Sequence, residues 1–201
     1  MTDVRVCFTK LGKLKYISHL DLQRAIARML VRSGLPIGYS EGFNPHPKLN
    51  IALPLSIYQE GERELFDFKI TENVPLEEIE EKLKKSSFPG MDIISVSFPS
   101  GKPKTKTAVW RLELITEITP EEFASAFDGE MNVVKRSKAG EKVVDISPMA
   151  KFVSAERTED GIVARVELNA AGNDYLNPSY VTAFFGEKLR IKRVVRENIL
   201  F

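Results

Sequence analysis

The chain has a single cysteine, Cys7, among its 201 residues. One cysteine excludes an intramolecular disulfide and any zinc or iron–sulfur site that needs several cysteines of this chain. The first residues lack the apolar core of a signal peptide, and no apolar run approaches the roughly 20 residues that cross a bilayer. We therefore expect a cytoplasmic, reduced protein with no membrane partner.

Several motifs of cofactor chemistry are also missing. The sequence has no P-loop, no Rossmann glycine pattern and no nucleophile elbow. We therefore expect no cofactor in this chain, and a binding or accessory role more readily than catalysis.

Charge is unevenly distributed, although the net charge is only +1. Residues 1–50 carry eight basic and three acidic side chains, whereas residues 51–100 carry five basic and ten acidic ones. This asymmetry points to an interaction surface in the N-terminal part of the chain.

Apolar spacing predicts the secondary structure. In the first half we expect a strand over 4–9, a helix over about 19–33 that Ser18 caps and Gly34 ends, short strands over 37–39 and 49–53, a strand over 64–70, a helix from 75 and a strand over 93–98. In the second half we expect a strand over 108–115, a helix from 119, strands near 131–135, 142–155 and 162–168, a helix over 177–185 and a strand over 188–195.

Each half thus has the order strand, helix, several strands, helix, strand. This order predicts an α+β protein made of two tandem ferredoxin-like (βαββαβ-type) sandwiches, each with an extra strand. The segment 100–105, rich in proline, glycine and lysine, is the expected linker between domains at 1–99 and 106–201.

The first expected helix carries a basic stripe. Arg24, Arg28 and Arg32 recur every four residues and therefore share one face. Guanidinium groups suit phosphates, and a neighbouring aromatic ring can stack on a base. The preceding turn adds further candidates of both kinds: Lys10, Lys13, Lys15 and Tyr16. A solvated helix face, or arginines paired with the acidic region at 60–81, is an equally simple explanation.

The loop Ser40–Lys48 holds one of the two histidines, His46, between Pro45 and Pro47. Two prolines exclude a central strand here, and a polar loop of this kind is a candidate binding segment. His46 and His19 could act together as acid and base on a phosphodiester, or join Asp21 as metal ligands. Asp21 already has a capping role in the expected helix, so we expect no metal site.

The last expected strand offers a second basic patch. Lys188, Arg190 and Lys192 alternate with apolar residues and should share one face. An edge strand protected by charge against aggregation accounts for the pattern equally well.

Two segments resemble a known bacterial family, the radical-SAM-linked proteins, whose members are encoded beside or fused to cobalamin-binding radical-SAM proteins. The segments are Phe8-Thr9-Lys10 with Gly12, Lys15–Leu22 and Arg24, and then Tyr39–Lys48. The resemblance is dense over residues 5–70 and implies a radical-SAM protein as partner, in a genetic neighbourhood that suggests RNA or ribosome biology. It supplies no catalytic residues.

We hypothesise a non-catalytic accessory protein that binds RNA or a ribonucleoprotein through the basic helix and the Pro-rich loop. An RNA-processing or RNA-modifying enzyme using His19 and His46, and an adaptor that docks only on protein, are the alternatives. The residues expected to bind RNA or the partner are Lys10, Lys13, Lys15, Tyr16, His19, Arg24, Arg28, Arg32, Ser40, Phe43, Asn44, His46, Lys48, Lys188, Arg190 and Lys192.

Overall fold

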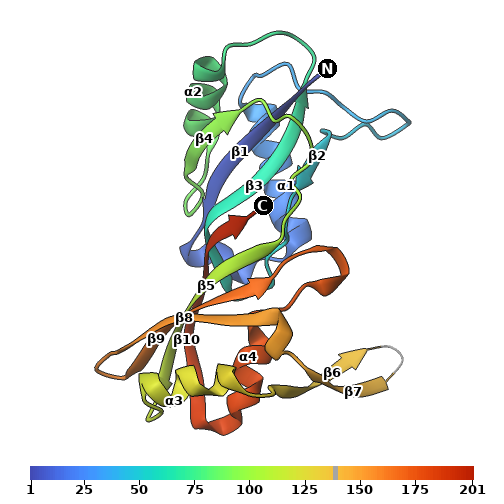
Figure 1. Ribbon diagram of the computed structural model, residues 1–201. Coiled ribbons are helices and arrows are strands. Elements are labelled where there is room, and N and C mark those ends of the chain that lie inside the picture. Colours follow the sequence, from blue (N-terminus) through green and yellow to red (C-terminus); the bar gives the residue numbers. More distant parts are fainter. Residues whose placement is uncertain (138–139) are drawn as a thin grey trace. The chain divides into compact units, whose positions relative to one another are not determined.

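Alternating apolar and polar residues build the first strand, β1 (Thr2–Lys10), whose even-numbered positions from Val4 onward are buried. The computed structural model describes residues 1–137 and 140–201 (Figure 1). It divides into two units, Met1–Pro103 and Lys104–Phe201. The boundary lies within residues 100–105. Both units combine helices with antiparallel strands, so the chain has the mixed α and β character that its periodicity predicts.

The first unit contains one sheet and two α-helices. Its elements are β1, the 3₁₀ turn η1 (Gly12–Tyr16), α1 (His19–Arg32), β2 (Leu49–Ile51), β3 (Gln59–Ile70), α2 (Leu76–Ser86) and β4 (Ile93–Ser97). The strands lie in the order β4-β1-β3-β2, and every neighbouring pair is antiparallel.

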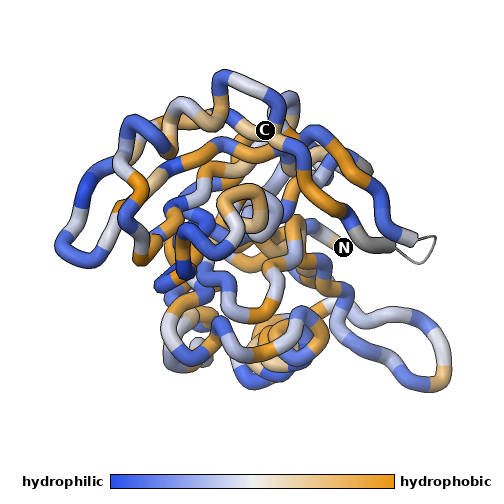
Figure 2. The backbone as a smooth tube through the Cα atoms, turned by 90° about the horizontal axis from the view of Figure 1, so that it is seen from below, coloured by the Kyte–Doolittle hydropathy of each residue, from blue (hydrophilic) through white to orange (hydrophobic). Residues whose placement is uncertain are grey.

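Both helices of this unit pack on one face of the sheet. The core joins side chains of β1 and β3 to Ile26 and Met29 of α1 and to Ile79 and Leu83 of α2. Hydrophobic and hydrophilic positions alternate along the chain, as Figure 2 shows. The opposite face of β1 and β3 carries half-buried side chains, among them Arg5, Asp67 and Lys69.

The second unit repeats this order with an insertion. Its elements are β5 (Thr107–Thr116), α3 (Pro120–Ser125), η2 (Ala126–Asp128), β6 (Asn132–Ser137), β7 (Gly140–Asp145), η3 (Ser147–Met149), β8 (Ala150–Arg157), β9 (Gly161–Asn169), η4 (Gly172–Asp174), α4 (Pro178–Phe185), η5 (Gly186–Lys188) and β10 (Leu189–Leu200). Four strands form the sheet β10-β5-β9-β8, again antiparallel, and β6 and β7 form a separate hairpin.

The expected extra strand differs between the units. In the described part of the first unit there is no strand besides β1–β4, and the segment expected over 37–39 makes only two isolated bridges, Ile37 with Ile70 and Tyr39 with Pro47. Pro47 has no N–H group to extend a ladder. In the second unit the addition is the two-stranded hairpin rather than one strand.

Within residues 1–137 and 140–201, no helix is both long and apolar enough to span a membrane.

Candidate nucleic-acid interface

The motif residues of the first unit lie at two ends of the sheet. At the start of β3, the Tyr58 amide donates to the Lys15 carbonyl at 2.6 Å. Near its end, the Gly38 amide donates to the Lys69 carbonyl at 2.7 Å. Ten residues of strand separate Gln59 from Lys69, which is about 33 Å. The turn at Lys15 and the loop that follows Gly38 therefore form separate surfaces.

The two histidines belong to different ends. His19 begins α1 directly after the η1 turn, and its Nδ1 is buried without a hydrogen-bond partner in the described structure. His46 bonds to Ser40, only two residues after Gly38. At this separation the two rings cannot act as acid and base on one bond.

The η1 turn presents an exposed aromatic pair. Tyr16 is 58% exposed and Tyr58 is 69% exposed, and their rings meet edge to face with centroids 5.9 Å apart. The Lys15 Nζ atom lies 5.3 Å from the Tyr16 ring centroid, and Lys13 on the same turn is exposed. Tyr58 holds its ring there with a φ of +70°, a backbone region that non-glycine residues rarely adopt. This surface combines ring faces with positive charge.

The three arginines of α1 have three different environments. Arg24 pairs with Asp21 at 3.0 Å, and both side chains are more than half exposed. Arg28 is exposed and makes no hydrogen bond or ion pair with described residues. Arg32 donates to the carbonyl of Ser86 at 3.1 Å, which satisfies an acceptor at the C-terminus of α2. Arg28 is therefore the arginine most available to a partner, and Arg24 is the next.

Asp21 acts as the cap that the sequence predicts. The Ser18 hydroxyl donates to Asp21 Oδ2 at 2.7 Å and accepts from the Asp21 amide at 3.2 Å. These bonds from Ser18, followed by the bond from Arg24, hold the pKa of Asp21 below its ordinary value. In the residues that the structure describes, no group of three histidine, cysteine, aspartate or glutamate side chains could hold a metal ion.

The Pro-rich loop, Ser40–Lys48, extends away from the sheet (Figure 1) and is closed at its base. The Ser40 amide donates to the His46 carbonyl at 2.8 Å, and the Ser40 hydroxyl accepts from the His46 amide at 3.1 Å. The His46 Nδ1 atom lies 3.0 Å from the same hydroxyl. Beyond this base, Phe43 is fully exposed and Asn44 is exposed as well. The loop presents an aromatic side chain on a stiff support.

Lys10 is not part of an exposed surface. It is 1% exposed, and its Nζ donates to the Gln59 carbonyl at 2.9 Å. Its position follows from strand geometry, because Lys10 shares the inward face with Val6 and Phe8. The expectation that Lys10 contacts a partner is therefore wrong.

The C-terminal patch is exposed but is not the alternating face that its sequence suggests. Lys188 lies in η5, before β10 begins, while Arg190, Ile191 and Lys192 are exposed in succession. The register against β5 shifts between Ile191 and Arg193, which breaks the alternation at Lys192. Lys192 also pairs with Asp160 at 3.0 Å, and this bond raises its pKa.

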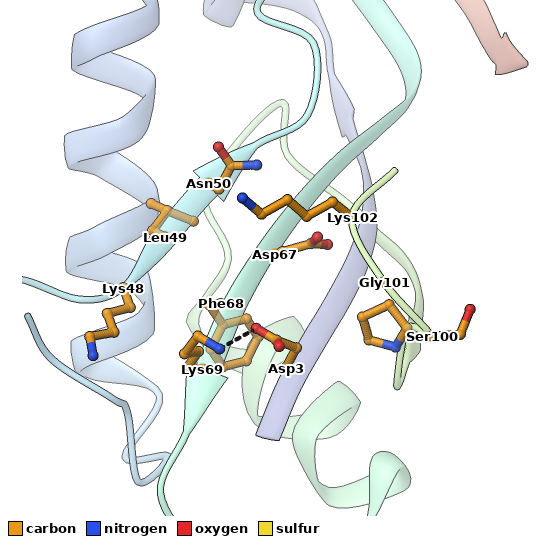
Figure 3. A pocket seen from close by; sticks show the side chains of 11 residues that line it. Asp3, Lys48, Leu49, Asn50, Asp67, Phe68, Lys69, Ser100, Gly101 and Lys102 are labelled. Atoms are coloured by element: carbon orange, nitrogen blue, oxygen red, sulfur yellow. Dashed lines mark ion pairs between the residues drawn. The ribbon is translucent and has the colours of Figure 1, made fainter. Parts of the chain in front are cut away.

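Two features were not apparent from the sequence. One is Tyr58, which completes the aromatic pair from 42 residues beyond Tyr16. The other is a polar hollow on the outer face of the first sheet, lined by Lys48 and Lys102 among others (Figure 3). Each brings together segments distant in the chain, so no local pattern signals them.

Comparison with known proteins gives one structural match and a family. No curated protein matches the chain. A solved structure described as "Crystal Structure of a Cbf5-Nop10-Gar1 Complex" has a chain that aligns with a TM-score of 0.49 and 10% identity, over 98% of this chain and 48% of that one. This protein thus spans about half the length of that neighbour. A family model described as "Uncharacterized protein conserved in bacteria (DUF2344)" matches residues 4–178, so the chain belongs to this family.

Proposed function

We propose that this protein is a non-catalytic accessory protein of a radical-SAM system and binds RNA, or an RNA–protein complex, through its first unit. The observation that carries the proposal is the exposed face of α1. Arg24 and Arg28 point to solvent there, and the helix begins directly after the turn that carries Lys13 and Tyr16.

Nucleic acid suits this surface better than a generic anion. Arg28 has no partner among the described residues, so a phosphate can bind it without breaking an ion pair. Arginine binds phosphate oxygens through two parallel hydrogen bonds. The Tyr16 and Tyr58 rings are exposed and offer faces on which unpaired bases stack. A single-stranded or looped RNA supplies both groups at a short spacing.

The radical-SAM partner enters from the family resemblance of the segments Phe8–Arg24 and Tyr39–Lys48. Cys7 is the only cysteine in this sequence, so residues 1–201 do not themselves supply the cysteine triad of a radical-SAM cluster. The Pro-rich loop is the docking segment in this proposal. Phe43 is fully exposed, and its loop and the η1 turn form separate surfaces, which allows RNA and the partner to bind at once.

We further infer that both units are ferredoxin-like sandwiches. The support is the order of the strands in the two sheets, which are β4-β1-β3-β2 and β10-β5-β9-β8. In both sheets the first strand of the unit lies between the last strand and the third, and the second strand lies at an edge, where the β6–β7 hairpin is not counted. In this assignment the β6–β7 hairpin is an insertion between α3 and β8.

The test is fluorescence anisotropy with a labelled single-stranded RNA and a labelled hairpin RNA. The variant Arg24→Gln/Arg28→Gln removes two cations from α1. The matched control is Lys82→Gln/Lys85→Gln, which removes two cations from the exposed face of α2, where they pair with Glu78 and Glu81. We expect the α1 variant to bind at least fivefold more weakly and the α2 variant to bind like wild type.

Absence of binding at low salt, or equal losses in both variants, would contradict an RNA surface on α1. The partner is tested separately by co-purification with a cobalamin-binding radical-SAM protein, with and without nuclease. Capture that survives nuclease and is lost in Phe43→Ser supports docking through the loop. Capture that Phe43→Ser leaves unchanged removes the loop from the proposal.

A further inference from the structure

A hollow of about 580 Å³ lies on the outer face of the first unit's sheet, opposite the helices (Figure 3). Its floor is formed by strands β1, β2 and β3, and its wall by the segment Pro99–Lys102. The lining side chains are mainly polar. This volume is within the range of about 300–1,000 Å³ that small-molecule sites occupy.

Both carboxylates in the floor are already neutralised. Asp67 accepts two hydrogen bonds of 2.8 Å from Arg5, its neighbour across β1 and β3. Asp3 pairs with Lys69 at 2.9 Å, as the dashed line in Figure 3 shows. The floor itself therefore contributes no net charge, and the charge of the hollow is set by its remaining residues.

The remaining charges are two ammonium groups. Lys48 lines one side of the hollow, and Lys102 reaches over it from the wall toward Asn50 (Figure 3). Neither lysine makes a hydrogen bond or an ion pair with described residues, and the side-chain amide of Asn50 is also without one. The hollow is thus positively charged and holds unused hydrogen-bond donors.

Arg5 fixes the wall. In addition to Asp67, its Nη2 atom donates to the Gly101 carbonyl at 2.8 Å. One half-buried guanidinium therefore ties the segment Pro99–Lys102 to both central strands. Because the wall is already held in place, binding a ligand there costs less conformational entropy.

We propose that this hollow binds a small organic phosphate ester of mononucleotide size. The phosphate is held by Lys102 and the Asn50 amide, which lie close together in Figure 3, Lys48 adds positive charge at the side of the hollow, and the organic part lies against Pro99. A free phosphate ion alone would leave most of the volume empty. The site is separate from the α1 surface, because it lies at the Lys69 end of β3.

The experiment is a titration of the full-length, ¹⁵N-labelled protein with adenosine 5′-monophosphate, followed by amide NMR shifts. Adenosine and inorganic phosphate are titrated in parallel. We expect shifts concentrated at residues 48–50 and 99–102, with affinity at least tenfold weaker in Lys102→Gln. The matched control is Lys104→Gln, an exposed lysine close in sequence that does not line the hollow.

The pattern of NMR shifts decides whether the hollow is a phosphate-ester site. Shifts at these residues with the monophosphate, weaker ones with inorganic phosphate and none with adenosine support the site. Three results overturn it: equal binding of adenosine, equal losses in both lysine variants, or no shift with any phosphate up to roughly 10 mM, which is tenfold above a Kd of about 1 mM. Arg24→Gln/Arg28→Gln should leave the titration unchanged, so this result is independent of RNA binding.

Discussion

Two cross-strand ion pairs on β1 and β3 should differ sharply in their contribution to stability. Arg5 and Asp67 face each other directly, and so do Asp3 and Lys69. The first pair is bidentate, with side chains 19% and 16% exposed. The second has one contact, with side chains 36% and 52% exposed. Strands, register and charge type are thus matched, while burial and geometry differ.

The expected magnitudes follow from these differences. An exposed pair contributes about 0.2–1 kcal/mol, and we expect about 0.5 kcal/mol for Asp3 with Lys69. Bidentate, charge-assisted bonds are about twice as strong as neutral ones, and partial burial reduces screening by salt. We therefore expect a coupling of about 2 kcal/mol for Arg5 with Asp67, about a 30-fold change in the unfolding equilibrium.

The assay is a pair of double-mutant cycles, measured by urea unfolding of the full chain. One cycle uses Arg5→Met and Asp67→Ala, and the other uses Lys69→Met and Asp3→Ala. The cycle isolates the pair, because the bond from Arg5 to Gly101 is lost in both variants that lack Arg5. At 1 M NaCl the weaker coupling should vanish and most of the stronger one remain. Equal couplings below about 0.5 kcal/mol would show that burial and bidentate geometry do not strengthen the Arg5–Asp67 pair.

Three further predictions concern other parts of the chain. Gly161→Ala should destabilise the protein by about 3 kcal/mol or more, because a Cβ atom there would lie 2.1 Å from the Leu114 carbonyl oxygen. In the control Gly129→Ala the new Cβ meets open space, so stability should be nearly unchanged. Thermal unfolding measures both variants. Backbone amides that donate to Asp145 are the main reason that its pKa lies below the ordinary value. The ionised carboxylate therefore stabilises the folded protein fully above about pH 4, and this stabilisation is lost as the pH falls through the lowered pKa. The difference in Tm between wild type and Asp145→Asn should accordingly disappear at a pH below the lowered pKa. Tyr58→Asn keeps a residue that tolerates positive φ but removes the ring, and RNA affinity should fall about 5- to 100-fold in anisotropy while the Tm stays within a few degrees.

Local signals predicted the helices and most strands correctly. The Ser18 hydroxyl accepts from the Asp21 amide, and Gly34 follows the end of α1 with a φ of +67°. Thr119 and Glu122 form the complete capping box that opens α3. Capping depends on residues three positions apart, so the sequence contains the whole interaction.

Features that depend on distant partners were missed. Lys10 is buried because its ammonium reaches the Gln59 carbonyl, 49 residues away. Lys192 leaves the alternating face because β10 bulges against β5. Charge alone made Lys10 look like a surface residue, and alternation alone placed Lys192 on one face with Arg190, whereas strand register decides which face a residue takes.

The candidate site was predicted in its parts but not in its arrangement. The sequence marks the η1 turn, α1 and the Pro-rich loop as one motif region, yet the pairing of β3 places the turn and the loop at opposite ends. The hollow beside Lys48 also needs Asp67 and the segment 99–102. Four segments far apart in the chain meet there, since Asp3 of β1 also lines the hollow, and only the tertiary fold brings them together.

The salt dependence of RNA affinity is the sharpest test of an RNA-binding surface on α1. The logarithm of the binding constant for a single-stranded RNA is measured against the logarithm of salt concentration, for wild type and for Arg24→Gln/Arg28→Gln. Each phosphate contact contributes about 0.7 to the slope, so loss of two contacts should flatten it by about 1.4. Parallel lines for the two proteins would contradict an RNA-binding surface on α1.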